Sequence, residues 1–185
     1  RILQHNENKV VIVDEAYVDF ADQSAATLVE KYENLLVIQT MSKSRALAGL
    51  RVGFALGNEE LINGLIRMKD SFNSYPVDRL ALVGAKAAIE DETYFKEITD
   101  KIITTRSWIT EELQSLGFSV LPSATNFVFA SHESYPAERL YESLRQRNIL
   151  IRYFNTKPID NFVRITIGTD EEMKQLIRAI EEIIL

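Results

Sequence analysis

The chain has 185 residues, of which 46% are hydrophobic and 26% are charged, and its formal net charge at pH 7 is −6. This length allows one core or two small lobes, and the acidic balance with scattered basic residues argues against nucleic-acid binding. No apolar run reaches the roughly 18–20 residues of a membrane span, and no secretory signal opens the chain. Because the chain has no cysteine, disulfides and thiolate metal sites are excluded, and we expect a cytoplasmic protein.

The first half of the chain alternates β-branched runs with helical stretches. It begins at Arg1 instead of Met and soon enters a strand pattern, so we expect a piece cut from a longer protein. Strands are predicted over residues 9–14, 35–40 and 53–57, the first two with the composition of buried parallel strands. Helices are predicted over residues 25–32 and over residues 59–69, the latter with Asn58 as its N-cap. This alternation indicates an α/β layer.

The second half predicts long helices followed by interleaved strands and helices. Helices are expected over 77–90, over 92–116 before the C-cap residue Gly117, over 136–147 and over 170–184. Thr169 and Glu172 form the sequence pattern of a capping box before the last helix. Strands are expected over 118–121, 126–130, 150–153 and 162–167. We therefore predict two domains, residues 1–91 and residues 92–185, the second being an α+β lobe that begins with a long connecting helix.

Polar clusters follow the first strands. Asp14-Glu15-Ala16-Tyr17 comes after the first strand, and Thr40-Met41-Ser42-Lys43-Ser44 comes after the second. Open α/β sheets bind their ligands at the carboxyl ends of parallel strands. A third cluster, Leu47 to Gly53, contains Arg51, eight residues after Lys43.

These clusters carry a resemblance to a known family. VVIVDEAYVDF, followed by QTMSKSRALAGLRVGFALGN, resembles fold-type-I pyridoxal-phosphate aminotransferases, and most of all their histidinol-phosphate branch. ATNFVF and FVRITIGT extend the resemblance to the end of the chain. It covers essentially the whole chain but only the C-terminal half of a family member. It implies an α/β fold made of part of the large cofactor domain, with a mostly parallel sheet, and a small α+β domain.

The resemblance implies a pyridoxal 5'-phosphate site. Lys43 is the implied Schiff-base lysine, which also moves a proton between the substrate and the cofactor. Asp14 is implied at the ring nitrogen, where a carboxylate favours the protonated form, and Tyr17 at the phenolic oxygen. Without the resemblance, Asp14 would be interpreted as a cap of a strand or helix, and Tyr17 as a packing residue. The implied phosphate ligands are Arg51, Thr40 and Ser42. The guanidinium of Arg51 suits this role because it binds a phosphate through two parallel hydrogen bonds.

Three residues near the end of the chain are implied to bind substrate. Arg164 matches the arginine that binds the substrate's carboxylate or equivalent end, and burying its charge in a β-branched strand needs a partner. Arg152 is implied at the substrate phosphate, with an exposed edge-strand position as the alternative. Asn126 matches a residue near the substrate, with a structural turn as the alternative.

The implied reaction converts histidinol phosphate and 2-oxoglutarate to imidazole acetol phosphate and glutamate. An aromatic or aspartate-type aminotransferase, or a phosphothreonine decarboxylase, has the same core motifs. Family members usually work as homodimers. The family's phosphate-cradling turn, stacking aromatic residue and asparagine belong to its N-terminal half, so we expect this piece alone to be inactive and the full-length enzyme to be active.

A different class of protein is also compatible with one motif. Residues 10–16 resemble a Walker B strand, in which an acidic pair handles magnesium in an ATPase. Such proteins carry a glycine-rich phosphate loop upstream, and only nine residues without glycine precede this strand. The ATPase is therefore disfavoured. His5 and His132 are too far apart in sequence to suggest a metal site, and we expect both, like Arg45, at the surface.

Overall fold

The computed structural model describes residues 1–184, which divide into two compact units, one of Arg1–Ile98 and one that begins at Thr99. The division falls within the long helix α3 (Glu92–Ser115), whereas the sequence placed the domain boundary at the start of this helix.

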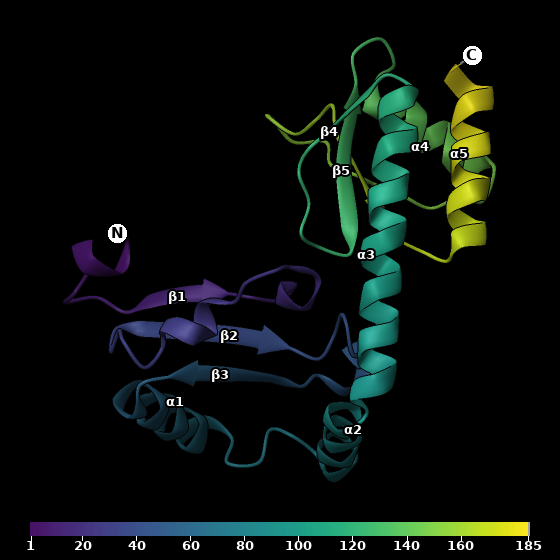
Figure 1. Cartoon of the computed structure of the whole chain (residues 1–185). Helices are drawn as coiled ribbons and strands as arrows, with labels where there is room; N and C mark the ends of the chain where they lie inside the picture. The colour runs from purple at the N-terminus through teal and green to yellow at the C-terminus, as the bar shows by residue number, and fades with distance from the viewer. Residues whose placement is uncertain (185) are drawn as a thin grey trace. The chain divides into compact units, whose positions relative to one another are not determined.

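The first unit contains a three-stranded mixed sheet in the order β1-β2-β3. Its strands are β1 (Val11–Asp14), β2 (Leu35–Thr40) and β3 (Gly53–Gly57), within two residues of the predicted bounds. β1 and β2 are parallel, and β3 runs antiparallel to β2, as the arrowheads in Figure 1 show. Local composition identified the strands but contained no information on the direction of β3.

The helices of the first unit begin at capping residues. Asn58 accepts a hydrogen bond from Glu60 N at 2.8 Å, which confirms it as the N-cap of α1 (Glu59–Phe72). Asp78 accepts from Ala81 N at 2.9 Å, so α2 (Arg79–Glu90) starts two residues later than predicted. Single 3-10 turns are η1 (Leu3–His5), η2 (Val18–Phe20), η3 (Ala25–Leu28) and η4 (Ala48–Leu50).

The predicted helix over residues 25–32 is wrong. Only the 3-10 turn η3 forms there. Glu15 accepts hydrogen bonds from Ala25 N at 2.6 Å and from Ser24 Oγ at 2.7 Å. These bonds fix the start of the segment from a residue that lies outside it, and helix propensity does not include such a contact.

The first unit leaves many large apolar side chains exposed. Its buried residues cluster on β2 and its neighbours, among them Leu35, Val37 and Phe20. Exposed ones include Phe72 at 96% and Tyr75 at 90%, and others are Val10, Ile12, Ile38, Phe54, Leu56, Met68 and Leu80. Apolar surface on this scale is typical of faces that contact other protein.

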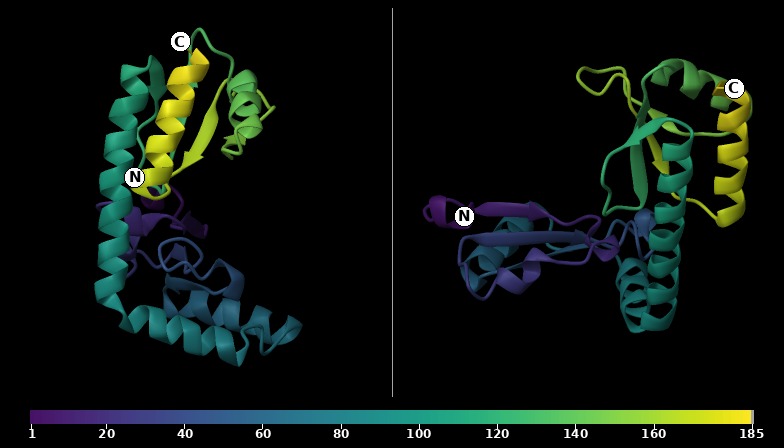
Figure 2. Two further views of the ribbon diagram at one scale, coloured as in Figure 1. Left: turned by 90° about the vertical axis from the view of Figure 1, so that its right-hand side faces the viewer. Right: turned by 45° about the horizontal axis from the view of Figure 1, so that its top comes forward.

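The second unit is a two-layer α+β structure, as predicted. Its antiparallel sheet has the order β4-β5-β7-β6, with β4 (Phe118–Val120), β5 (Phe127–His132), β6 (Arg152–Tyr153) and β7 (Val163–Thr166). Helices α4 (Ala137–Gln146) and α5 (Asp170–Ile184) and the later turns of α3 cover one face of the sheet (Figures 1 and 2).

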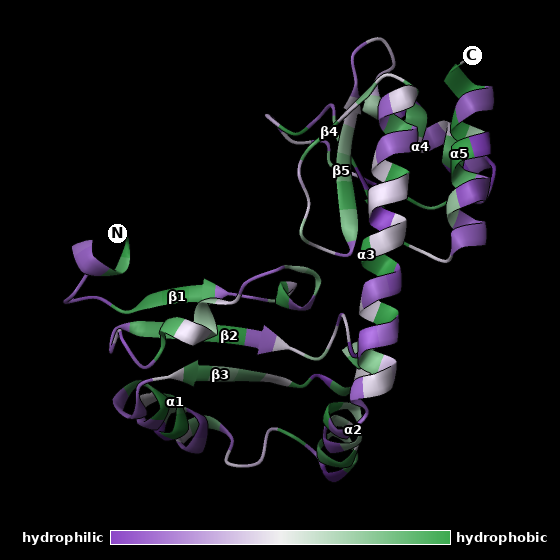
Figure 3. Ribbon diagram, in the orientation of Figure 1, coloured by the Kyte–Doolittle hydropathy of each residue, from purple (hydrophilic) through white to green (hydrophobic). Residues whose placement is uncertain are grey.

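One hydrophobic core holds the second unit together. Val128, Val163 and Ile165 of the sheet pack against Leu140 of α4 and Ile180 of α5, all nearly inaccessible to water. Figure 3 shows the apolar side of α5 turned toward the sheet and its polar side turned away. Because successive strand residues face opposite sides, the intervening residues of β5 and β7 lie on the face without helices.

The capping box at the start of α5 is confirmed. Thr169 N donates to the Glu172 carboxylate at 2.7 Å, and Glu172 N donates to Thr169 Oγ1 at 3.3 Å. The bond from the Thr169 backbone, and then that from its hydroxyl, holds the pKa of the Glu172 carboxyl below its usual value.

This capping box predicts a pH dependence of stability. Because folding lowers the pKa of Glu172, its contribution is complete above the unfolded value and is lost as the pH falls through the folded value. We expect Tm to fall more steeply below about pH 4.5 in the wild-type protein than in Glu172→Gln, since glutamine keeps the cap without titrating. Thermal melts followed by circular dichroism between about pH 3 and 7 measure the difference. Parallel curves would contradict the assignment.

Candidate active site

The loops that carry the expected cofactor residues leave the sheet side by side. Asp14 is the last residue of β1, and the parallel ladder pairs it with Ile38 of β2. Glu15 N continues the ladder by donating to Ile38 O at 2.8 Å. The loop with Tyr17 therefore starts beside the loop with Lys43, at the carboxyl ends of both strands.

Lys43 and Tyr17 lie next to each other. The Lys43 Nζ atom is 5.4 Å from the centroid of the Tyr17 ring, within the range of a cation–π contact. Lys43 is exposed and Tyr17 is half-buried. An amine that is open to solvent is placed to react with a carbonyl compound, and here the Tyr17 ring lies beside it.

Asp14 ends its strand with an exposed carboxylate. Its Oδ1 accepts a hydrogen bond from Ala16 N at 3.0 Å, so the side chain does make the local cap that was the alternative to a cofactor role. The cap also orients the carboxylate at the strand end. A carboxylate held there favours a positive charge placed against it.

Hydroxyl groups and a guanidinium lie where β2 ends and β3 begins. Thr40 Oγ1 contacts Ser42 Oγ at 2.9 Å and accepts from Ser42 N at 3.1 Å. Thr40 pairs with Gly53, two residues after Arg51. Arg51 has a left-handed φ of 55° and donates to Ala48 O at 2.9 Å. Non-glycine residues in this region of backbone space are uncommon and concentrate at functional sites.

The second unit brings the two expected substrate arginines together. Arg164 in β7 pairs with Phe129 of β5 on one side and with Arg152 of β6 on the other. Residues that are directly paired share a face of the sheet. The three therefore form a row across the face that the helices leave open.

Aromatic rings surround these arginines. The Arg164 guanidinium lies 5.3 Å from the Phe127 ring centroid and 5.8 Å from that of Phe154, and Arg152 lies 5.5 Å from the latter. Among the described residues, Arg164 Nε is a buried nitrogen without a hydrogen-bond partner. Two adjacent positive charges and a buried donor favour the binding of an anion at this face.

Asn126 has a structural contact. Its carbonyl accepts from Ile167 N at 2.9 Å, which joins the start of β5 to the end of β7. Its side chain is half-buried. This backbone bond extends the β5–β7 ladder, and both the turn role and a substrate contact of the Asn126 side chain stay predictions.

The surface position predicted for Arg45 is wrong. The side chain is half-buried, its NH1 donates to Ala88 O, and its guanidinium stacks 3.7 Å from the centroid of Phe95. Ala88 lies in the last turn of α2, where carbonyls lack partners within the helix. Arg45 supplies one of these partners, a contact that no local pattern encodes.

The two histidines have different environments. His5 is exposed, as expected. His132 is half-buried in β5, so its predicted surface position is wrong: Nδ1 accepts from Ser134 N at 3.2 Å, and Nε2 lies 3.2 Å from Leu116 O. It closes the end of α3 and is a structural residue.

The sequence did not identify Glu15, Ser44 and Asp19 as residues that hold these loops. The Glu15 carboxylate accepts from Gln39 Nε2 at 2.9 Å, in addition to its bonds at η3, and so ties the Tyr17 loop to β2. The buried Ser44 hydroxyl donates to Asp19 Oδ2. Each of these three lies within two residues of Asp14, Tyr17 or Lys43 in the sequence. Spacing alone, however, does not predict which side chains make contact.

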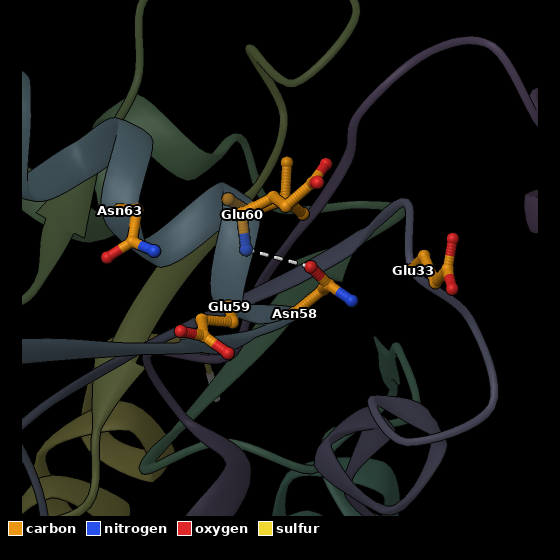
Figure 4. Close-up of a pocket in the computed structure, with 6 residues that line it drawn as sticks. Glu33, Asn58, Glu59, Glu60 and Asn63 are labelled. Carbon is orange, nitrogen blue, oxygen red and sulfur yellow. Dashed lines mark hydrogen bonds between the residues drawn. The ribbon is translucent and has the colours of Figure 1, made fainter.

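A separate depression lies at the start of α1 (Figure 4). Its lining residues are Glu33, Asn58, Glu59, Glu60, Leu61 and Asn63. The Asn58–Glu60 bond in the figure is the helix cap. Within residues 1–184, no group of three or more acidic or histidine side chains is suited to a metal ion, and no helix is long and apolar enough to cross a membrane. The depression contains none of the predicted site residues.

Comparison with known proteins identifies the family. The family model described as "Aminotransferase class I and II" matches residues 1–180. The chain belongs to this family.

Relatives within the family are more specific. A histidinol-phosphate aminotransferase from Marinomonas sp. (strain MWYL1) is 61% identical over 182 residues, covering 97% of this chain and 52% of the relative. The crystal structure of the Clostridium acetobutylicum histidinol-phosphate aminotransferase matches with a TM-score of 0.90 and 28% identity, over 99% of this chain and 57% of that one. The Sinorhizobium meliloti enzyme, solved in complex with pyridoxal-5'-phosphate, matches with a TM-score of 0.85 and 30% identity, over 100% and 52%. The chain thus spans about half the length of the curated relatives it matches.

Proposed function

We propose that the full-length protein is a pyridoxal-phosphate enzyme that transfers the amino group of histidinol phosphate to 2-oxoglutarate, giving imidazole acetol phosphate and glutamate. The observation that carries this proposal is the meeting of the Asp14 and Lys43 loops at the carboxyl ends of β1 and β2, with Lys43 over Tyr17. The names of the relatives support the choice of substrate.

The side chains of the first unit fit the chemical groups of this cofactor. Bound pyridoxal phosphate supplies an electron sink for the bond that breaks at the substrate's amine-bearing carbon. Lys43 would hold the cofactor through its amine, and its Nζ would move a proton during the reaction. Asp14 stabilises a protonated ring nitrogen, and Tyr17 donates a hydrogen bond to a phenolic oxygen.

The phosphate of the cofactor needs donors of a different kind. Arg51 provides a planar guanidinium, which binds a phosphate through two parallel hydrogen bonds. Thr40 and Ser42 provide hydroxyls at the end of β2. Their bonds to each other and to the backbone orient these hydroxyls before any ligand is bound.

The arginine pair of the second unit is proposed to bind the substrate's anionic groups. Arg164 is assigned the carboxylate of the amino-acid partner or the equivalent end of the substrate, and Arg152 the phosphate of histidinol phosphate. The unpartnered Arg164 Nε and the neighbouring like charge support an anion at this face. Asn126 is assigned to the same end of the substrate.

The remaining properties belong to the whole protein. We propose that this chain alone binds the cofactor poorly, since it spans about half the length of its relatives. We also propose a homodimer in the cytoplasm. The exposed Phe72 and Tyr75 support a further protein contact on the first unit.

Turnover of a donor panel by the full-length protein tests the proposal. Histidinol phosphate is expected to exceed histidinol by about 100-fold or more in kcat/KM, because the two differ only in the phosphate that Arg152 is proposed to bind. Aspartate and aromatic amino acids should react more slowly still. Preferred turnover of aspartate or phenylalanine, or release of carbon dioxide from phosphothreonine, would contradict the proposed reaction.

A further inference from the structure

The backbone around Lys43 forms a closed turn. Lys43 O accepts from Ala46 N at 3.1 Å, and Leu47 N donates to Met41 O at 3.0 Å. Ala46 has a left-handed φ of 54°. Residues 41–47, the lysine turn, therefore have a defined conformation in which the carbonyl of Lys43 is fixed.

One side chain ties the lysine turn to the segment that carries Tyr17. Ser44 directly follows Lys43 and is only 4% exposed, and its hydroxyl donates to Asp19 Oδ2. Asp19 lies in η2, two residues after Tyr17. A hydrogen bond to a carboxylate is charge-assisted, and removing the Asp19 side chain takes this acceptor away from the buried Ser44 hydroxyl.

The acceptor end of this bond is itself anchored. Phe20, beside Asp19, is 1% exposed, and its backbone N donates to Tyr17 O at 3.1 Å. Glu15, at the start of the same segment, accepts from Gln39 Nε2 on β2 at 2.9 Å. The bond therefore attaches the lysine turn to a segment that is fixed to the sheet.

We propose that the Ser44–Asp19 hydrogen bond holds Lys43 over Tyr17, so that Ser44 and Asp19 are positioning residues for the lysine that carries the cofactor. The inference rests on the proposed function. The bond fixes the residue after Lys43 relative to the segment of Tyr17, and the Lys43 Nζ lies 5.4 Å from the ring centroid. Without the bond, the lysine turn loses a side-chain contact with η2.

The full-length protein loaded with pyridoxal phosphate provides the test. Its readouts are turnover and the pH midpoint of the cofactor's visible band, which responds to the surroundings of the Lys43 nitrogen. Ser44→Ala removes the donor and is expected to lower kcat about 10- to 100-fold, as displacement of a reacting group by about 1 Å does. It should also move the midpoint by about half a pH unit or more.

Two further variants separate the bond from the charge. Asp19→Asn keeps an acceptor for the Ser44 hydroxyl, so its midpoint should stay near that of the wild type. Asp19→Ala breaks the same bond from the other side and should reproduce the shift, which keeps the test available if Ser44→Ala does not fold. A midpoint that moves as far in Asp19→Asn as in Asp19→Ala would overturn the inference.

Thr105 provides a matched control. It is 5% exposed, and its hydroxyl donates to Asp170 Oδ1 at 2.8 Å. Thr105→Val therefore removes a part-buried hydroxyl–carboxylate bond of the same kind and should lower Tm without moving the midpoint. If the pH midpoint of the visible band is the same in Ser44→Ala, Thr105→Val and wild type, the positioning role is overturned while the proposed function still stands. A wild-type protein whose cofactor is not attached to Lys43 would overturn the proposed function and this inference with it.

Discussion

Replacement of Lys43 by alanine in the full-length protein is expected to reduce kcat at least about 1,000-fold. The variant loses both the amine that attaches the cofactor and the group that moves the proton, and either role alone accounts for large factors in rate. Steady-state turnover with histidinol phosphate and 2-oxoglutarate measures the effect. The visible absorbance of the variant should no longer show a covalently attached cofactor.

Lys31 is the matched control for this prediction. It is exposed, and its Nζ lies 5.5 Å from the centroid of the Tyr32 ring, much as Lys43 lies over Tyr17. Lys31→Ala should keep wild-type turnover and spectrum. Turnover by Lys43→Ala within about tenfold of wild type would be inconsistent with a catalytic role, since general acid–base catalysis alone contributes about 100-fold or more.

Replacement of Arg164 by alanine is expected to lower kcat/KM by about 100- to 10,000-fold. The guanidinium can make two charge-assisted hydrogen bonds to an anionic group, each contributing about 1.5–3 kcal/mol. Arg164→Lys should recover only part of the loss, because an ammonium lacks the planar pair of donors. Initial rates for both half-reactions, measured with the full-length protein, show which substrate depends on this arginine.

Arg139 and Arg152 serve as comparisons for Arg164. Arg139 belongs to the same unit and also lies over an aromatic ring, 5.3 Å from the centroid of Tyr135, so Arg139→Ala should leave kcat/KM unchanged. Arg152→Ala should weaken turnover of histidinol phosphate but not that of histidinol. If Arg139→Ala and Arg164→Ala are equally active, Arg164 does not bind the substrate.

The elements that the sequence predicts well are those set by local chemistry. β2 and β3 were predicted with their observed bounds because their apolar runs end at polar or glycine residues. Asn58 and Glu172 mark helix starts because their side chains bond to backbone groups only two or three residues away. In each of these cases, the residue that identifies the element and the group it contacts lie within a few positions of each other in the sequence.

The failures involve contacts between distant parts of the chain. The stretch after Ser24 forms only a 3-10 turn, because the Glu15 carboxylate binds its first backbone amide. Arg45 is half-buried because its guanidinium donates to a carbonyl at the end of α2. The direction of β3 likewise depends on its pairing with β2 and not on its own residues.

The candidate site shows the same division. Asp14, Tyr17 and Lys43 could be selected because they follow parallel strands and match a family motif. Ser44 and Asp19 are 25 residues apart, and their contact becomes visible only once β1 and β2 are paired. Motifs therefore identify groups that react or bind ligands, whereas the structure is needed to find the residues that position them.

Covalent attachment of the cofactor to Lys43 can be measured chemically. Borohydride reduction of the full-length protein with bound pyridoxal phosphate makes the link to the lysine permanent, and peptide mass mapping then locates it. We expect the modification on the peptide that contains Lys43, and no such modification in Lys43→Ala. Modification of a different lysine in the wild-type protein, with Lys43 unmodified, would contradict it.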